Sequence, residues 1–241
     1  MSGTIALSQL EVRRSLRNRR TMFFAVLYPT ILFLAIGGSA TWTIDGVPGK
    51  TYELIAMASF GALGAALTTN ANKIALERKE GWTRQLRLTA LPGSGYVVSK
   101  VAAAMATTVP AVVVVFAVGA ATGVHLSPAL WFEAFLILWI GSLTFTSLGI
   151  AIGYGVPYDS VQIVSIIVYI GLSLIGGLWF PLGGVIGKFA KFSPSFQVRE
   201  LALDVVTKTH ISAGGLVILA AWLVGAAALA AAMYRRGVTV D

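Results

Sequence analysis

The side chains that could do chemistry in this chain are few. It contains no cysteine, and its two histidines, His125 and His210, have no second metal ligand at a suitable spacing. No nucleophile motif, no H-E-x-x-H zinc motif and no G-x-x-x-x-G-K-[ST] phosphate loop occurs. The sequence therefore predicts no catalytic residue and no metal site, and it gives no sign that the chain binds ATP itself.

The charged residues concentrate instead in residues 73–100, the run KIALERKEGWTRQLRLTALPGSGYVVSK. In a helix, Glu80 and Arg84 would form an i,i+4 ion pair, and Trp82 and Leu86 would form an apolar ridge. A run with this many charged residues cannot lie in hydrocarbon. We therefore expect it in water between two spans. It is typical of a helix that docks into a groove on a soluble partner; the alternative is a helix lying flat on lipid headgroups.

The composition indicates that membrane-spanning helices position this charged run. Of the 241 residues, 56% are hydrophobic and only 12% are charged, whereas soluble domains carry about 25% charged residues. We therefore expect an all-α, polytopic membrane protein with a single transmembrane domain over residues 1–241. The predicted spans are residues 22–40, 54–72, 97–121, 129–153, 161–180 and 211–233.

Three segments outside the spans complete the expected architecture. Residues 4–20 read as an amphipathic interfacial helix, although a plain basic flank of the first span is an alternative. Residues 73–96 form the charged region, and residues 181–210 an outer re-entrant segment with short helices. In the first segment the apolar anchors are Ile5, Leu7, Leu10 and Leu16, and the contacts to anionic lipid are Arg13, Arg14, Arg17, Arg19 and Arg20.

The basic residues predict the orientation. The net charge is +8, and most of the 18 Lys and Arg residues fall on the side of the membrane that carries both termini and residues 73–96. That asymmetry places the termini in the cytoplasm and the protein in the cell membrane. Because the basic residues cluster at span ends, nucleic acid is a poor explanation for the charge.

Ionisable residues inside the spans look nearly absent. Glu133 is the one acid clearly inside a predicted span, and it lies in the first turn, near the outer surface. The simpler interpretation is an interfacial residue at a helix terminus. With so few protonatable groups, a proton- or sodium-coupled carrier is disfavoured.

Three motifs, taken in order along the chain, resemble the six-span permease subunits of type-2 ABC exporters. Glu77–Thr83, followed by Leu86 and Leu91-Pro92, resembles the coupling region of that family. Gly177–Pro181 resembles its signature at the outer end of the fifth span, and Phe192-Ser193-Pro194 the motif that follows. Between the last two, Gly184–Lys188 departs from the family's Leu-Pro-x-Trp, so the outer helices are expected to be shorter or shaped differently.

The resemblance implies a half-transporter. Two such subunits, identical or merely similar, would form the pathway among membrane lipids, and separate cytoplasmic ATPase subunits would bind the ATP and Mg²⁺. The chain itself would bind no cofactor. The residues implied in ATPase docking are Glu77, Arg78, Glu80, Gly81, Trp82, Thr83, Arg84, Leu86 and Pro92, and those implied in the substrate pathway are Phe60, Tyr169, Leu172, Trp179 and Phe180.

The main hypothesis is thus a permease that exports a hydrophobic or amphipathic substrate, such as a drug-like molecule or a lipid. A membrane sensor or immunity protein with the same fold, without transport, is the first alternative. An intramembrane enzyme is a weaker one, because it would need polar catalytic groups facing each other within the spans.

Overall fold

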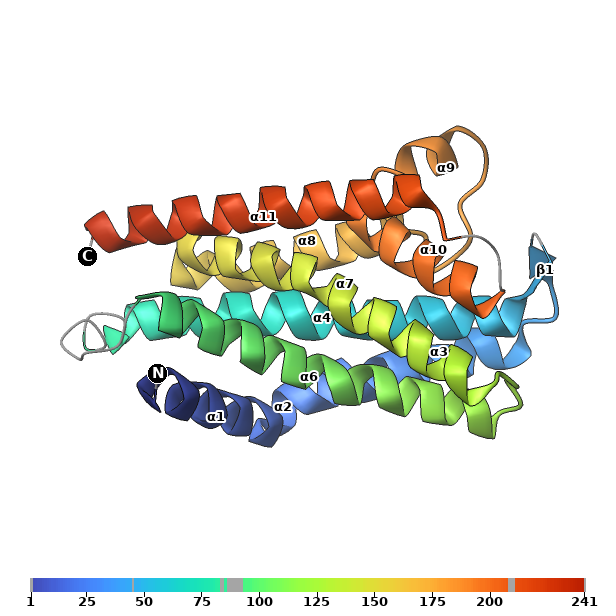
Figure 1. Ribbon diagram of the computed structural model, residues 1–241, viewed down its shortest axis with the longest axis horizontal. Helices are drawn as coiled ribbons and strands as arrows, with labels where there is room; N and C mark the ends of the chain where they lie inside the picture. Colours follow the sequence, from blue (N-terminus) through green and yellow to red (C-terminus); the bar gives the residue numbers. More distant parts are fainter. Residues whose placement is uncertain (1, 45, 83–84, 86–92, 208–210, 241) are drawn as a thin grey trace.

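The computed structural model describes residues 2–44, 46–82, 85, 93–207 and 211–240. Long helices run side by side, and the two termini lie near the same end of the molecule (Figure 1). The helices are α1 (Ser2–Arg17), α2 (Arg19–Met22), α3 (Tyr28–Ile36), α4 (Gly49–Lys79), α6 (Gly93–Ala121), α7 (Pro128–Gly155), α8 (Tyr158–Ile175), α9 (Gly184–Ala190), α10 (Pro194–Val206) and α11 (Ala213–Val240).

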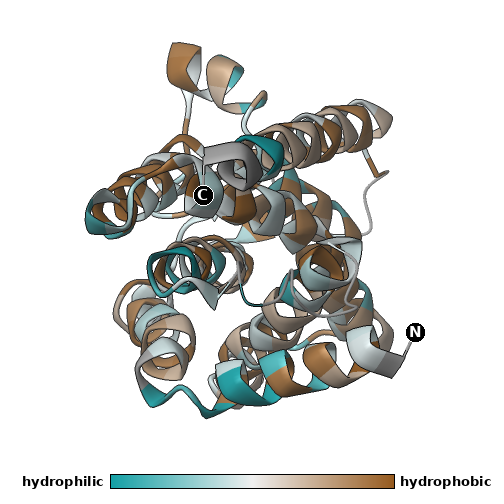
Figure 2. Cartoon of the chain, turned by 90° about the vertical axis from the view of Figure 1, so that its left-hand side faces the viewer, coloured by the Kyte–Doolittle hydropathy of each residue, from teal (hydrophilic) through white to brown (hydrophobic). Residues whose placement is uncertain are grey.

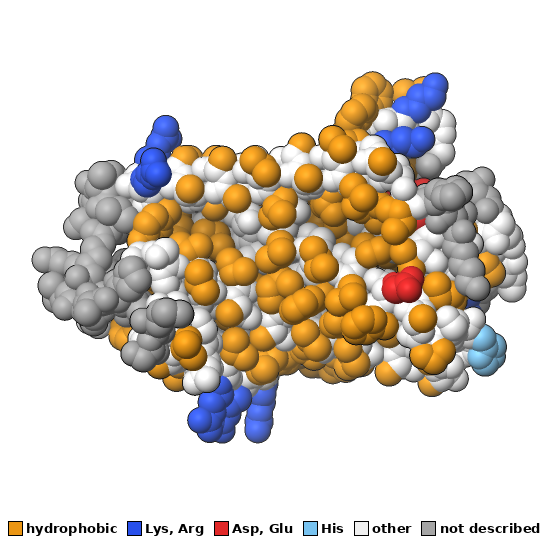
Figure 3. All heavy atoms as spheres, in the orientation of Figure 1, with side chains coloured by type: hydrophobic (Ala, Val, Ile, Leu, Met, Phe, Trp, Pro, Cys, Tyr) orange, Lys and Arg blue, Asp and Glu red, His pale blue; other side chains and the backbone are white. Residues whose placement is uncertain are grey.

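Among the described residues, five helices are long and apolar enough to cross a membrane, namely α4, α6, α7, α8 and α11. On the face shown in Figure 3, hydrophobic side chains cover the middle, and Lys and Arg side chains lie toward the two ends. A bilayer imposes this distribution, because charged groups are costly in hydrocarbon and tolerated at its interfaces. The chain is therefore a multi-pass membrane protein.

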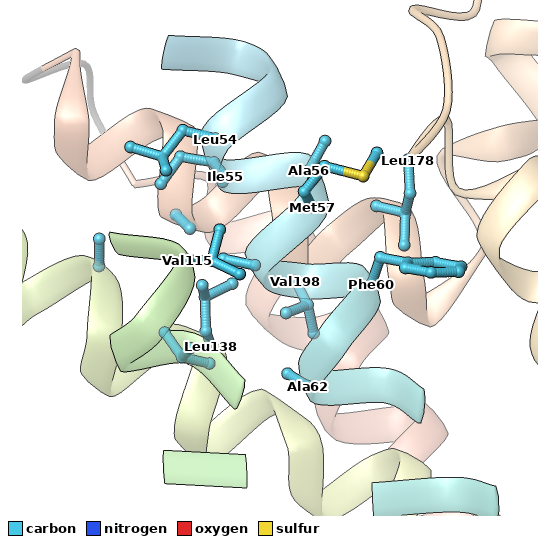
Figure 4. Close-up of a cluster of buried hydrophobic side chains, with 14 of the residues drawn as sticks. Leu54, Ile55, Ala56, Met57, Phe60, Ala62, Val115, Leu138, Leu178 and Val198 are labelled. Carbon is cyan, nitrogen blue, oxygen red and sulfur yellow. The ribbon is translucent and has the colours of Figure 1, made fainter. Parts of the chain in front are cut away.

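The helix α4 lies at the centre of the bundle. Its most apolar 18-residue window is 83% buried, against 11% for that of α11. Figure 4 shows Met57 and Phe60 of α4 within a buried cluster that also receives side chains from the neighbouring helices. Glycine allows this close packing: a Cβ at Gly149 of α7 would lie 2.5 Å from the carbonyl oxygen of Leu67.

The first apolar segment, predicted to span at residues 22–40 with a kink at Pro29, is not one regular helix. It consists of a π-helical turn η1 (Phe23–Leu27), then α3, then a 3₁₀ turn η2 (Gly37–Ser39). The cause is Pro29, which has no N–H to give to the carbonyl four residues earlier, that of Ala25. Gly61 of α4 packs against this irregular point, since a Cβ there would lie 3.0 Å from the Pro29 ring.

The fifth apolar helix is shorter than expected. Residues 161–180 were predicted to span, but α8 ends at Ile175. Gly177 has φ +65°, a left-handed conformation that favours glycine and turns the chain out of the helix. The segment that follows forms α9, which projects from the bundle, and α10, which packs back against it (Figure 1).

The segment between the first apolar segment and α4 contains a small antiparallel pair of strands, β1 (Thr43–Ile44) and β2 (Val47–Pro48). The intervening turn includes Gly46 at φ +81°. Tyr52, in the first turns of α4, packs edge-on against Trp42, with the ring centroids 5.5 Å apart. The hairpin therefore closes the end of the bundle opposite the termini (Figure 1).

Candidate functional site

The charged run leaves α4 at Gly81. The helix ends at Lys79, and the N–H of Gly81 donates to the carbonyl of Arg78 at 3.0 Å. Gly81 has φ +69°, and its carbonyl accepts a hydrogen bond from the N–H of Gln85. Gly81 therefore ends α4 directly after Glu80, and the pairing of Glu80 with Arg84 stays a prediction, because Arg84 lies outside the described residues.

The predicted docking residues fall into three groups. Glu80 is exposed, and Gly81 and Trp82 are partly exposed, so a partner could reach them. Glu77 and Arg78 turn inward. Thr83, Arg84, Leu86 and Pro92 lie outside the described residues.

Glu77 connects α4 to α6. Its side chain accepts a hydrogen bond from the Tyr96 hydroxyl and pairs with the Lys100 ammonium at 2.5 Å. Lys100 is buried, and its ammonium also lies 2.7 Å from the carboxylate of Glu11 on α1. One buried cation thus joins two carboxylates from two other helices.

Arg78 connects α4 to the end of α7. Its Nη1 donates to the carbonyls of Gly153, Tyr154 and Val156 at 3.0, 2.8 and 3.4 Å. The last carbonyls of a helix lack intrahelical partners and carry partial negative charge. The guanidinium therefore caps α7 from a neighbouring helix.

Lys79 reaches α8. Its ammonium lies 3.9 Å from the carboxylate of Asp159 and 4.0 Å from the centroid of the Tyr158 ring. Three successive residues of one helical turn therefore contact three different helices. We call Glu11, Lys73, Glu77, Arg78, Lys79 and Lys100 the charged junction.

The N-terminal helix α1 joins this junction through its polar side. Glu11 and Ser15 are buried, and Lys73 of α4 contacts both, at 2.7 Å and 3.2 Å. Three of the four predicted apolar anchors face outward, since Ile5, Leu10 and Leu16 are exposed. The helix thus presents apolar and basic side chains to its surroundings, as an interfacial helix does.

The environment of Glu11 keeps it ionised. Burial alone would raise the pKa of Glu11, but the ammonium groups of Lys100 and Lys73 outweigh burial and lower that pKa. Removing one partner from a buried ion pair leaves an uncompensated charge, which typically costs about 3–5 kcal/mol. Loss of either partner should therefore destabilise the contact of α1 with the bundle.

Sequence reasoning missed Lys100 and Glu11, although two signals were present. Lys100 lies within the predicted span at residues 97–121, and a charged residue inside a span indicates a functional or paired group. Thr4, Ser8, Glu11 and Ser15 recur at helical spacing and mark the inward side of α1.

The predicted pathway residues come together between α4 and α8. The ring of Phe60 stacks on Tyr169 at 4.6 Å between centroids, and it meets Trp179 edge-on at 5.3 Å. The Tyr28 ring also lies close to Phe60, with the ring centroids 5.9 Å apart. We call Tyr28, Phe60, Tyr169 and Trp179 the aromatic cluster.

The other two predicted pathway residues lie outside this cluster. Leu172 is partly buried, and its carbonyl accepts a hydrogen bond from the Ser195 hydroxyl at 2.5 Å. Phe180 is exposed. The end of α8 therefore places Trp179 among the aromatic rings and turns Phe180 out of the bundle.

Arg199 of α10 holds that end of α8. It is buried, and its Nη1 donates to the Tyr52 hydroxyl and to the carbonyls of Gly176 and Gly177, all at 2.8–2.9 Å. These carbonyls are unpaired at the helix end, so the guanidinium stabilises the turn that carries Trp179. Glu53 is buried close by, and its Oε2 has no hydrogen-bond partner among the described residues.

Several ionisable groups are buried in the bundle, and only Lys100 among them lies within a predicted span. Glu11, Glu53, Glu77, Lys100 and Arg199 are all buried. Conversely Glu133, the acid expected inside a span, is exposed on α7. His125 is exposed, and His210 lies outside the described residues.

Comparison with known proteins identifies the family. Residues 3–206 match the family model described as ABC-2 type transporter. A protein of Bacillus subtilis (strain 168) named "Putative transport permease YvfS" is 25% identical over 201 residues, covering 81% of this chain and 82% of that protein. The family match takes in the charged junction, the aromatic cluster and Arg199. This chain therefore belongs to the ABC-2 type transporter family, as a permease that spans the membrane several times.

Proposed function

We propose that the chain is the transmembrane subunit of an ATP-driven exporter. Two copies, or one copy and a similar chain, would form the pathway in the cell membrane, with six spans each and both termini in the cytoplasm. The sixth span would be the irregular segment of η1, α3 and η2. ATP and Mg²⁺ would bind to separate ATPase subunits, since the sequence offers no phosphate loop.

The observation that carries this proposal is the continuity of α4. One unbroken helix contains Phe60 of the aromatic cluster and Glu77, Arg78 and Lys79 of the charged junction. Phe60 and Glu77 are 17 positions apart, which corresponds to roughly 25 Å along the axis. A displacement at one end of such a rigid element therefore reaches the other.

The charged junction explains how such a displacement would spread. Glu80, which is exposed, and Gly81 and Trp82, which are partly exposed, follow directly on the last turn of α4, where an ATPase would dock. A push on them would act on Glu77, Arg78 and Lys79, which hold α6, α7 and α8 respectively. The inward residues are thus positioning residues, and the exposed ones are the docking surface.

The aromatic cluster supports a hydrophobic or amphipathic substrate. Phe60 is fully buried, so the cluster is closed in this conformation. The bond from the Tyr169 hydroxyl to the Phe60 carbonyl is 3.3 Å, which is long for an O–H donor and hence weak. Separation of α8 from α4 would break this bond and expose the rings to a drug-like molecule or a lipid.

The test is to isolate the chain from native membranes in mild detergent, identify what accompanies it, and measure ATP hydrolysis. An ATPase subunit in stoichiometric amount, with hydrolysis that responds to lipophilic substrates, supports the exporter. An isolated chain without an ATPase overturns it. An ATPase that is present but never responds to any substrate favours the sensor alternative.

A charge reversal makes the test specific to the proposed docking surface. Glu80→Lys should reduce the amount of ATPase recovered, because it changes the charge at an exposed position beside the helix end. Glu133→Lys is the matched control, since it reverses an exposed acid on α7, near the opposite end of the bundle. Equal recovery with both variants would contradict docking at this surface.

A further inference from the structure

An apolar groove runs between α7 and α11 on the outside of the bundle. It has a volume of about 380 Å³ and is lined by Leu148, Ala221, Trp222, Gly225, Ala226 and Leu229. These residues lie well inside two helices that are long and apolar enough to span a membrane. The groove therefore opens to the hydrocarbon region, where lipid acyl chains are the surrounding medium.

Gly225 keeps the middle of the groove open. A Cβ built at this glycine meets no atom within 4 Å. Ala226 beside it is buried, whereas Trp222 and Leu229 are exposed at its two ends. The shape is thus a shallow channel along α11 with larger side chains at either end.

One end of the groove adjoins the segment that carries α9. The indole Nε1 of Trp222 donates to the carbonyl of Phe192 at 2.7 Å. Phe192 directly follows Lys191, the residue that ends α9. The groove and α9 are therefore neighbouring parts of one surface.

In α9 the small residues face the protein and the large apolar residues face outward, which is the opposite of a helix on a water-exposed surface. Its small residues Gly187 and Ala190 are buried against the protein, and a Cβ at Gly187 would lie 2.8 Å from the carbonyl oxygen of Leu182. Its large apolar residues face outward, as does Phe192 just beyond its end: the exposed fractions of Val185, Ile186, Phe189 and Phe192 are 69%, 67%, 72% and 65%. In Figure 2 this short helix stands apart from the bundle at the top of the view.

Two lysines accompany these apolar side chains. Lys188 and Lys191 are exposed and are three residues apart, so they lie on the same side of the helix. Residues 180–192 contain no acidic residue that could neutralise them. In Figure 3, Lys and Arg side chains stand beside hydrophobic ones on this projection. Large apolar groups with nearby ammonium groups and no carboxylate fit a lipid headgroup region.

We propose that this surface is a phospholipid site. One acyl chain occupies the groove between α7 and α11, and Lys188 and Lys191 bind the lipid phosphate in the leaflet opposite the termini. A second copy of the chain is a poorer occupant of α9. Two copies facing each other through this helix would bring four lysines together without a carboxylate from the segment.

The test is a titration of the purified chain with dioleoyl phosphatidylglycerol, read by native mass spectrometry. Gly225→Leu fills the groove, where it meets open space, and should abolish the tightest bound lipid. Lys188→Gln with Lys191→Gln should weaken binding roughly 30-fold, because each basic group near a lipid surface contributes about 1 kcal/mol. Gly214→Leu is the matched control, on the same helix but outside the groove.

Three outcomes overturn the proposal. If Gly225→Leu and the double Gln variant retain lipid as the unaltered chain does, the bound lipid is a general annulus. If inorganic phosphate displaces the lipid, the lysines form an anion site independent of the acyl chain. The third outcome uses Phe189→Cys, which introduces a single cysteine because the chain has none of its own. If oxidation cross-links this variant into a dimer, the surface is an interface between two copies of the chain.

Discussion

The ammonium of Lys100 on α6 lies 2.7 Å from the carboxylate of Glu11 on α1, and both side chains are buried. The contact joins residues 89 positions apart. It attaches a helix that presents Ile5, Leu10 and Leu16 outward to the membrane-spanning bundle through charge, beside the apolar packing of Leu7. The position of α1 therefore depends in part on a few ion pairs.

Lys100→Met should lower the free energy of unfolding by about 3–5 kcal/mol, because it leaves the Glu77 carboxylate buried without its cation. Adding Glu77→Gln should recover part of that loss by removing the uncompensated charge. Thermal unfolding in detergent measures both. Lys79→Met is the control, since its exposed pair with Asp159 at 3.9 Å should contribute no more than about 1 kcal/mol. A double variant as unstable as the single one would contradict the pairing.

Acid should weaken the α1 contact. The pKa of Glu11 in the folded chain lies below its ordinary value of 4.5. A lowered folded-state pKa gives stability that is present above the unfolded value and is lost as the pH falls through the lowered one. The melting temperatures of the unaltered chain and Glu11→Gln should thus differ at neutral pH and converge below pH 4.5. Glu133→Gln, at an exposed acid, should show no such convergence, and a constant difference for Glu11→Gln would exclude the ion pair as its source.

Arg78→Ala should loosen the end of α7. The Nη1 of the guanidinium donates hydrogen bonds to three carbonyls there. Hydrogen bonds to charged groups contribute about 1.5–3 kcal/mol. Amide hydrogen exchange should accelerate around residues 153–156, and a peptide from α11 serves as the internal control. Arg78→Lys should give an intermediate result, because a point charge still favours a helix C-terminus but cannot bond several carbonyls at once. Unchanged exchange in Arg78→Ala would show that the cap is dispensable.

Gly81→Ala should distinguish the effect of this turn on the stability of the chain from its effect on ATPase docking. A residue with a side chain at φ +69° is strained by about 1–2 kcal/mol, and a Cβ at Gly81 meets no atom within 4 Å, so the backbone alone is perturbed. Gly123→Ala imposes the same kind of strain, at φ +98° and also in open space, on the loop between α6 and α7. Both variants should lose similar stability, whereas Gly81→Ala alone should reduce ATPase recovery. Equal recovery would place the docking surface elsewhere.

The sequence was most informative about features that composition and periodicity alone determine. It predicted a helical membrane protein and the apolar helices that include α4, α6, α7 and α11, because burial in lipid dictates length and hydrophobicity. A kink at Pro29 could be expected from its missing N–H, but the division of the first apolar segment into π, α and 3₁₀ turns could not. Nor did the sequence show that α8 would stop at Ile175, because a left-handed Gly177 leaves no trace in hydropathy.

The candidate site was predicted unevenly for a related reason. Phe60, Tyr169 and Trp179 were named together and do meet, with Phe60 at the centre. The charges were harder, because Glu11, Glu77 and Lys100 are distant in sequence and look like separate interfacial residues until α1, α4 and α6 are placed side by side. Tertiary pairing removes the usual penalty of a buried charge, and hydropathy treats every charge as unpaired.

Trp179→Ala should change the response of the transporter to its substrate more than its assembly. The indole packs edge-on against Phe60 at 5.3 Å and donates to the Ser173 hydroxyl at 2.9 Å, so its loss opens the aromatic cluster at the end of α8. Trp131→Ala is the matched control, because Trp131 makes a comparable edge-on contact with Phe116 at 5.0 Å, outside the cluster. Aromatic pairs of this kind contribute about 0.5–1.5 kcal/mol beyond their buried area, so both variants should assemble with a similar loss of stability. ATP hydrolysis by the assembled complex, measured against the concentration of a lipophilic fluorescent dye, should shift for Trp179→Ala and not for Trp131→Ala. If the two variants respond alike, Trp179 stabilises the turn held by Arg199 and takes no part in recognising substrate.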